Sequence, residues 1–594
     1  MSRTIRIGNA QAFWGDRPSA AMELLAQDPT LDYLTMDYLA EVSMSILALQ
    51  QERDAKLGYA QDFVEVVRGL ADYWASGGQC RLIANAGGLN PRECARECMS
   101  ALEQAGCQSL KIGVVCGDNV LNVMLSCRET SFDFQNLDTA QSLTSVRDRL
   151  VTANAYLGCD GIVQALAAGA NIVITGRVAD PAMVVAPCVH AFGWDRNEWD
   201  LMAGATVAGH LLECGTHVTG GIATDWLDVP DPTHLGFPIA EIQSDGSCII
   251  TKSEQSGGYV TPETVKEQLV YEIGNPEQYL SPDCSVSFLG IQVKNVGVNR
   301  VHVSGARGTT KPKMLKVSAT YRDGFRAAGM LTFFGPHAVK KARRGAEMIL
   351  QRLREAGHTY RDSIVECLGN AECVPVSHLT KNFDSLFETV MRIAVESESR
   401  NAIEQFTREI MPLITAGPQG TTGYAEGRPR VHGVIRYWPC LIDAERVQQS
   451  VEFVHSADTL HARNRIAIWP PTLGRYPQER LGVGKNAKTV EPSEAKFLAD
   501  VAYGRSGDKG SGANIGILIR SHDHYDWLKS WLSAERVKEF FEPIGVNSVE
   551  RYEMPNVGGL NFVLKGILRR ALRNDAQGKA LAQALLSMPL NQEA

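Results

Sequence analysis

Residues 154–181, NAYLGCDGIVQALAAGANIVITGRVADP, constrain the fold of this chain more than any other stretch. Small and apolar residues predict a helix over 161–168, and the β-branched run at 171–175 is typical of a strand buried on both faces. A second helix is expected to start at Pro181, because proline is favoured in the first helical turn. Helix, buried strand, polar loop and helix in this order predict an α/β fold.

The polar residues between these elements have two interpretations. Asp160 and Asp180 stand where side chains cap helices, and capping alone would explain both carboxylates. In open α/β sheets, however, ligands bind in the loops that follow the carboxyl ends of strands. The loop from Gly176 to Asp180, which contains Arg177, is therefore the first place to expect a functional site.

Four other strand-like runs precede this stretch and alternate with helical patterns. The runs lie at 4–8, 33–36, 81–85 and 109–115, and the helical patterns lie at 18–26, 42–53, 63–75 and 91–104. Alternation of this kind predicts a mostly parallel, Rossmann-like sheet with helices on both faces.

If these strands are parallel, their polar loops lie at one edge of the sheet and supply candidate site residues. The candidates are Asp16, Arg17, Asp37, Asn85, Gly87, Gly88, Gly176, Arg177 and Asp180. Arg177 is suited to bind a carboxylate or phosphate, unless it only forms an ion pair with Asp180. Asp37 is a candidate for proton transfer, or else a first-turn acid favoured by the helix dipole. The remaining alternative for all these loops is that they only turn the chain and cap helices.

From residue 239 the pattern changes to a second, more antiparallel α+β region. A hairpin is predicted at 239–251, where Asp-Gly separates two apolar runs. Further strands are expected at 285–298, 300–304, 314–321, 328–333 and 430–438. Helices are expected at 336–356 and at 383–411, the second with an interruption. The predicted domains are 1–235, 236–470, a linker at 471–493, and 494–594.

The C-terminal domain is predicted to have the order β-β-α-β-β-α, a small sheet with helices on one face. Its strands are expected at 495–503, 514–520, 548–554 and 560–568, and its helices at 525–541 and 577–586. Residues 504–512 are rich in glycine and are predicted to form a loop. Successive backbone N–H groups there, with Arg505 and Lys509, could bind an anion. A flexible hairpin tip is the alternative.

Glu213 breaks a local rule of helix design. A helix that ends at Gly215 places this carboxylate in the last turn, where its charge opposes the macrodipole. Such a residue is a candidate general base, acid or cation anchor. Cys214 and His217 are close enough in sequence to form a thiol–imidazole pair, although most cysteines in folded proteins are simply buried.

Composition excludes several classes of function. The 594 residues carry a net charge of -8, which argues against a nucleic-acid partner. No signal peptide or membrane-spanning run is visible, and the 14 scattered cysteines suggest reduced thiols, so a cytoplasmic location is expected. The motifs of dinucleotide-binding proteins, P-loop NTPases, α/β-hydrolases and zinc sites are absent, so no metal is expected. A homo-oligomer is expected only as a general prior.

Several motifs together resemble the acyclic terpene utilisation protein AtuA family. They are GNAQAFWGDRP near the N-terminus, DYLAE, NAGGLNP, the stretch at 154–181, ECGTHVTGG and TAGPQGTTGY. The tail, with AYGRSGDKGSGANIGI, resembles the ferredoxin-fold C-terminal domain of that family. The resemblance covers nearly the whole chain. It implies a link to breakdown of acyclic terpenoids, which proceeds through acyl-CoA thioesters.

These observations lead to an expected enzyme of acyl-CoA or organic-acid catabolism, of the lyase or hydratase type. Arg177 and the glycine-bearing loops would hold the anionic substrate, and Glu213 with Asp37 or Asp180 would move protons. Coenzyme A would enter as part of the substrate; no other cofactor is indicated. Two alternatives remain: a non-catalytic acyl-CoA-binding or assembly subunit, and a hydrolase that uses Cys214 as its nucleophile.

Overall fold

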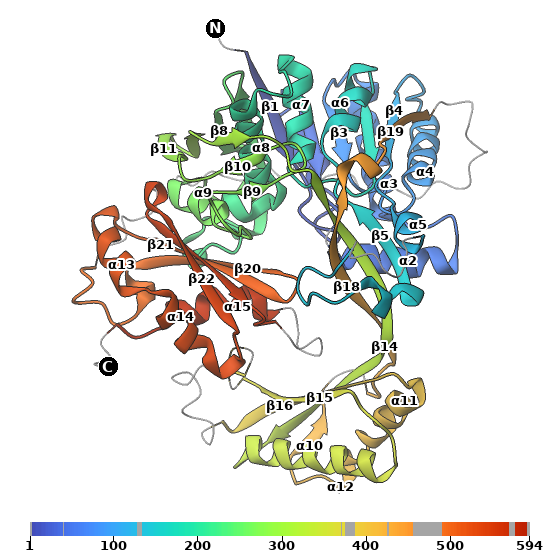
Figure 1. The fold of residues 1–594 in the computed structure, drawn as a ribbon, viewed down its shortest axis with the longest axis vertical. Coiled ribbons are helices and arrows are strands. Elements are labelled where there is room, and N and C mark those ends of the chain that lie inside the picture. The colour runs from blue at the N-terminus through green and yellow to red at the C-terminus, as the bar shows by residue number, and fades with distance from the viewer. Residues whose placement is uncertain are drawn as a thin grey trace.

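The computed structural model shows a large body, a C-terminal domain packed beside it and a small lobe below (Figure 1). It describes residues 3–590 except 40, 127–133, 370, 373, 375–385, 425–426, 455–489 and 569–575. Most of the predicted linker at 471–493 lies outside the described residues. Among the described residues, no helix has the length and apolar character needed to cross a membrane.

The body is built on five parallel strands, all of which were predicted. They are β1 (Thr4–Asn9), β2 (Tyr33–Met36), β3 (Arg81–Ala84), β6 (Ile172–Thr175) and β4 (Ile112–Cys116), adjacent in that order. One face is covered by α1 (Ala20–Gln27), α3 (Gln61–Ala75) and α4 (Pro91–Gln104). The other face is covered by α6 (Asp160–Ala167), α7 (Ala182–Phe192) and α8 (Trp199–Glu213). Helices on both faces are thus confirmed.

The sheet as a whole is mixed, so the prediction of a mostly parallel sheet is not confirmed. Antiparallel strands extend the block on both sides: β7 (Pro238–Gln243), β8 (Cys248–Lys252), β12 (Arg300–Ser304) and β11 (Gln292–Gly297) beyond β1, and β19 (Ser450–Val454) beyond β4. Hairpin strands need only short turns, and they cover edges that the parallel block would otherwise expose. The predicted hairpin β7–β8 is confirmed.

The remaining elements of the body connect and cover these strands. They are α2 (Glu41–Arg53), α5 (Leu121–Leu125), α9 (Pro262–Leu269), β9 (Tyr279–Leu280), β10 (Ser285–Ser287) and β13 (Arg307–Thr309). The last three strands form a small antiparallel sheet of their own, in the order β13-β10-β9.

One long strand, β14 (Met314–Phe334), runs from the body into the lobe (Figure 1). Its first half pairs with β5 (Leu150–Ala155). Its second half lies between β16 (Glu388–Ser397) and β17 (Thr421–Gly423). Residues 314–326 of β14 also pair with β18 (His432–Asp443). The two runs predicted at 314–321 and 328–333 are therefore one strand.

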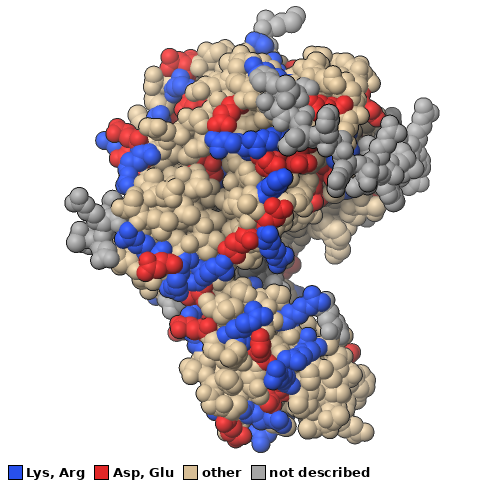
Figure 2. All heavy atoms as spheres, turned by 90° about the vertical axis from the view of Figure 1, so that its right-hand side faces the viewer, with Lys and Arg blue, Asp and Glu red and all other residues tan. Residues whose placement is uncertain are grey.

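The lobe is a small sheet covered by α10 (Ala338–Glu355), α11 (Arg400–Glu409) and α12 (Leu413–Ala416), with β15 (Asp362–Leu368) at one edge. Figure 2 shows it below a narrower neck, with acidic and basic side chains interspersed over the drawn face. The helix predicted at 383–411 is wrong in its first half, which is β16. In β16, Met391, Ile393 and Val395 alternate inward with a period of two, as a half-buried strand requires.

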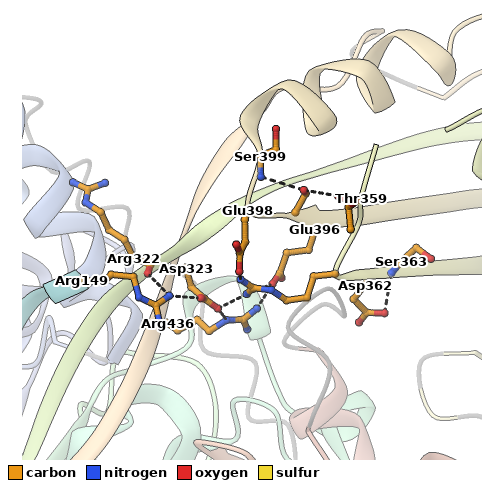
Figure 3. Close-up of polar contacts among 12 residues, drawn as sticks. Arg149, Arg322, Asp323, Thr359, Asp362, Ser363, Glu396, Glu398, Ser399 and Arg436 are labelled. Atoms are coloured by element: carbon orange, nitrogen blue, oxygen red, sulfur yellow. Dashed lines mark hydrogen bonds and ion pairs between the residues drawn. The ribbon is translucent and has the colours of Figure 1, made fainter. Parts of the chain in front are cut away.

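A cluster of charges lies where β14 leaves the body (Figure 3). The Asp323 carboxylate binds Arg149, Arg361 and Arg436, and Glu396 of β16 binds the last two of these arginines. Asp323 and Glu396 are 7% and 2% exposed. Arg149 comes from the body, Arg361 directly precedes β15 and Arg436 lies in β18, so this network links the lobe to the body.

The C-terminal domain has the predicted β-β-α-β-β-α order and four antiparallel strands. They are β20 (Ala502–Lys509), β21 (Gly512–Ile519), β23 (Gly559–Lys565) and β22 (Ser548–Met554), in that spatial order, with α13 (Tyr525–Trp531), α14 (Ala534–Phe541) and α15 (Ala576–Leu586). Two expectations are wrong. The first strand does not cover 495–503, and the glycine-rich segment 504–512 is mostly strand β20 and not a loop.

The glycines of β20 and β21 have a packing role that explains this error. A Cβ at Gly507 would lie 2.2 Å from the Cγ of Glu272, and one at Gly516 would lie 2.3 Å from Val270 Cγ2. Glycine therefore lets these strands approach the body closely. The contact is also polar, because the Asn514 amide donates to the carbonyl of Val270.

Candidate functional site

Asp37, at the end of β2, is a buried carboxyl group held by its neighbours. Its Oδ1 accepts hydrogen bonds from the Asn85 amide at 2.7 Å and from the Leu39 N–H at 3.1 Å. Burial, and then the charge of Asp180, raise the pKa of Asp37 well above its ordinary value, whereas Arg177 opposes the shift. A carboxyl group in this environment favours its protonated form and can donate a proton.

Asp118 follows β4 and organises the loop after β6. Its Oδ2 accepts from the Arg177 backbone N–H at 2.9 Å and from the Asn154 amide at 2.7 Å. Burial raises the pKa of Asp118, and these two hydrogen bonds oppose the shift. Asp118 therefore positions Arg177 through its backbone.

The Arg177 guanidinium is 4% exposed and lies between an acid and an aromatic ring. Its Nη1 donates to Asp180 at 2.7 Å, and its Cζ lies 4.1 Å from the centre of the Tyr156 ring. Although burial disfavours its charge, Asp180, Tyr156 and Asp37 raise the pKa of Arg177. Arg177 thus forms the ion pair with Asp180 that the sequence left as an alternative. The guanidinium is also within charge reach of Asp37.

The expected helix caps at Asp180 and Asp160 are wrong. Helix α7 has Pro181 as its N-cap residue, without a side-chain cap, because the Asp180 carboxylate binds Arg177. Helix α6 starts at Asp160 itself, whose carboxylate pairs with Arg196. Both acids are used in ion pairs instead.

The glycine-bearing loops meet at the same edge, but their N–H groups are committed. Gly87 donates to the Thr175 carbonyl, Gly88 to the Asn85 carbonyl and Gly176 to the Val115 carbonyl. These three N–H groups are therefore not available to stabilise an oxyanion of the substrate. Asp16 accepts from the N–H groups of its own loop, and Arg17 pairs with Glu23, so both of these candidates stabilise their loop.

Glu213, the last residue of α8, shares a proton with His210. The His210 Nε2 lies 3.0 Å from the Gln268 carbonyl oxygen, which only accepts, so Nε2 carries a hydrogen. The Nδ1 lies 3.1 Å from Glu213 Oε1. That contact requires either an imidazolium with a carboxylate or a neutral imidazole with a carboxylic acid. The pair thus holds one transferable proton.

This pair also explains how the chain tolerates Glu213 at a helix C-terminus. A hydrogen bond to a charged group contributes about 1.5–3 kcal/mol, more than the few tenths that the macrodipole costs an exposed acid. The hydrogen bond with His210 therefore compensates for the unfavourable position of the Glu213 carboxylate at the helix C-terminus.

Tyr279 packs against the imidazole of His210. Its ring centre is 5.9 Å from that of His210. Burial raises the pKa of Tyr279 well above its ordinary value, and the charges of Glu213 and Asp180 raise it further. Tyr279 is therefore within charge reach of both Glu213 and Asp180.

Cys214 and His217 lie in an environment that favours their neutral forms. Burial, and then the charge of Glu213, raise the pKa of the Cys214 thiol well above its ordinary value. Burial, and then Arg505 and Lys579, lower the pKa of His217 well below its ordinary value. A nucleophilic cysteine needs a thiolate, so these surroundings disfavour the hydrolase alternative.

Arg505, in β20, reaches the body beside these residues. It is 4% exposed, its Nη1 donates to the Ile222 carbonyl at 2.7 Å, and its Cζ lies 5.0 Å from the centre of the Tyr271 ring. The expected anion nest of backbone N–H groups is wrong, because they belong to a strand ladder. Lys509 ends that strand, and its side chain lies outside the described residues.

Sequence reasoning missed several members of the site. Asp118, Asn154, Tyr156, His210 and Tyr279 were not among the candidates. His210 precedes Glu213 by three residues, the spacing of neighbours on a helix, so its pairing was detectable. Tyr279 comes from a distant segment, and nothing local marks it. A cavity of about 210 Å³ beside Asp200 and Asp245 is lined by none of these residues.

The fold defines a mixed α/β protein with a ferredoxin-like C-terminal domain, and the site is a buried set of carboxyl, imidazole and guanidinium groups. The sequence model of the acyclic terpene utilisation family protein AtuA matches residues 5–453, and that of the AtuA ferredoxin-like domain matches residues 497–591. The chain therefore belongs to the AtuA family. No curated protein and no solved structure matches it.

Proposed function

We propose that this AtuA-family protein is an enzyme that moves protons on an organic acid or its coenzyme A thioester, as a lyase or hydratase. The observation that carries the proposal is the contact of His210 with Glu213 and Gln268, which requires one proton between the imidazole and the carboxyl group. Paired groups that hold one proton are suited to take a proton from a substrate and return it. The chain belongs to a family named for acyclic terpene utilisation, and acyl-CoA thioesters are the substrate class proposed on that basis.

Asp37 and Arg177 complete the proposed acid–base chemistry. The Asp37 carboxyl, with its raised pKa, acts as the acid, and Glu213 with His210 acts as the base. In a dehydration, the base removes the proton beside the substrate carbonyl, the C–O bond at the next carbon breaks, and Asp37 protonates the departing hydroxyl to give water. Arg177 supplies positive charge for the developing enolate.

Solvent deuterium exchange tests this proposal directly. Branched and straight-chain acyl-CoA thioesters and the corresponding free acids are incubated with the protein in D2O, and proton NMR follows the hydrogens beside the carbonyl. The wild type is expected to exchange them, and Glu213→Gln is expected to slow exchange by about 10²-fold or more. Equal exchange by both proteins would rule out the assigned base.

Arg92→Lys is the control, since Arg92 binds Glu452 in an exposed ion pair that the proposed chemistry does not use. It should exchange at the wild-type rate. A wild type that binds an acyl-CoA but exchanges nothing under any condition supports the alternative of a non-catalytic acyl-CoA-binding subunit.

A further inference from the structure

Two arginines of the C-terminal domain meet the body in similar ways but differ in their partners. Arg520 lies over the Tyr503 ring, and its Nη1 and Nη2 bind both oxygens of Asp225 at 2.7 and 2.8 Å. Its Nε donates to the Ala499 carbonyl. Every nitrogen of this guanidinium is thus paired.

Arg505 lies over the Tyr271 ring in the same manner, but only its Nη1 has a hydrogen-bond partner. Within the part of the chain that the structure describes, Nε and Nη2 are buried and bind nothing. Buried guanidinium N–H groups are rarely left unpaired, because desolvation without a hydrogen bond is costly.

The two unpaired nitrogens form one edge of the guanidinium, and that edge matches an oxyanion. Arg92 shows the match in this chain: its Nε and Nη2 bind the two oxygens of Glu452 at 2.7 and 2.5 Å. Parallel N–H groups of this kind recognise carboxylate and phosphate in a bidentate manner.

The acids near Arg505 have other partners. Glu267 accepts hydrogen bonds from the N–H and hydroxyl of Thr224, and Glu272 pairs with Lys579 at 3.3 Å. Lys579 also lies 4.4 Å from the centre of the Tyr271 ring. A second cation next to the same ring increases the attraction for an anion.

We propose that Arg505 binds an oxyanion, a carboxylate or phosphate group, through its Nε–Nη2 edge, so that the C-terminal domain completes the site of the body. The ligand is the anionic end of the substrate, a statement that rests on the proposed function. Cys214 and His217, adjacent to Glu213 in the chain, both lie within charge reach of Arg505.

Access to this edge requires the surrounding segments to move, and two of them are strained. Ile222, whose carbonyl accepts from Arg505, has a φ of 46°, and Glu272 has a φ of 53°. Left-handed conformations are unfavourable for side-chain-bearing residues, above all for β-branched ones, and such strain gathers at ligand-binding segments. Movement of the Ile222 segment opens the edge to the ligand.

The test measures anion binding to the full chain by isothermal titration calorimetry, with sodium succinate, inorganic phosphate and coenzyme A as separate probes. At least one is expected to bind, and the one that does identifies the anion as carboxylate or phosphate. Arg505→Lys should weaken binding at least tenfold, because lysine keeps the charge but lacks the two-nitrogen edge. Absence of binding by all three probes, or equal binding by Arg505→Lys, overturns the proposal.

Arg520→Lys is the control, because Arg520 also lies over a tyrosine ring and contacts the body, but its contact there is an ion pair with Asp225. It should bind the probe like the wild type; an equal loss in this variant would mean that both arginines only dock the domain. Hydrogen exchange of the wild type gives a second readout that needs no variant: the bound probe should slow exchange in residues 220–225, and unchanged exchange there counts against the proposal.

The two proposals fail separately. Glu213→Gln should bind the anion normally while losing deuterium exchange. Normal exchange in that variant removes the assigned base and leaves the anion site standing. Absence of anion binding at Arg505, with deuterium exchange that still depends on Glu213, removes the anion site and leaves the assigned base standing.

Discussion

Gly176 packs its α-carbon directly against the Asp118 carboxylate. A Cβ at position 176 would lie 2.4 Å from Asp118 Oδ1 and 2.6 Å from its Cγ. The same carboxylate holds the Arg177 N–H and the Asn154 amide. A single glycine thus determines where the loop after β6 places its arginine.

We therefore expect Gly176→Ala to damage the site although it removes no functional group. Forcing a methyl group into this contact should cost about 1–3 kcal/mol of the free energy of unfolding, as overpacking does. Displacement of Asp118 should also slow deuterium exchange of the substrate. Gly433→Ala is the control, since its Cβ would meet nothing within 4 Å. A fully stable and active Gly176→Ala protein would contradict the assigned role of Asp118.

Glu267 predicts a pH dependence of stability. Burial raises the pKa of Glu267 to about 7, above the ordinary value of 4.5, with Arg505 opposing and Asp225 reinforcing the shift. The folded chain therefore binds a proton between these values when the unfolded chain does not, so the free energy of unfolding falls as pH rises from 4.5 to 7. The loss is on the order of 3 kcal/mol.

Glu267→Gln should remove this contribution, because glutamine keeps an acceptor for Thr224 without a charge. Urea unfolding at pH 5 and pH 7.5 measures the difference. The variant should be as stable as the wild type at the lower pH and more stable at the higher one. The opposite order would mean that Arg505 holds Glu267 ionised.

The ion pairs of Asp323 should contribute to the free energy of unfolding. Although burial disfavours its charge, hydrogen bonds from Arg436 and Arg361 hold the pKa of Asp323 below its ordinary value. Asp323→Asn should lower the free energy of unfolding by about 1–3 kcal/mol, less than for a fully buried pair, because its arginine partners reach solvent. Asp362→Asn is the control, since within the described residues that carboxylate accepts only the Ser363 N–H. Equal stability of the two variants in urea would show that the network adds nothing.

The parallel block was predictable because each of its strands is a short apolar run followed by a polar loop. The course of β14 was not predictable, because Asp323-Gly324 resembles a turn. In the structure these residues form an irregularity within one strand, between Arg322 and Phe325. Local sequence cannot tell a turn from a bulge when the deciding partners, Glu396 and Arg436, come from distant segments.

The same limit applies to the site. Arg177, Asp37 and Glu213 carry local signals, namely a strand end or a helix end, so the sequence alone suggests them as candidates. The pairing of Glu213 involves His210, whose other nitrogen contacts the Gln268 carbonyl, and Arg505 is buried against Tyr271, so both features required the tertiary structure. Glycines that were interpreted as an anion-binding loop instead allow β20 to approach the body.

Cys214 predicts the outcome of thiol labelling. Its thiol is held neutral by burial and by the nearby Glu213, so iodoacetamide should label it slowly at pH 7.5. All other cysteines in the described residues are buried, and they should react only when the chain unfolds. Mass spectrometry of tryptic peptides over time gives the rate at each position. Fast labelling of Cys214 alone, abolished in His217→Ala, would restore the hydrolase alternative. Slow labelling throughout, with exchange activity intact in Cys214→Ser, would leave the proton shared by His210 and Glu213 as the chemical centre.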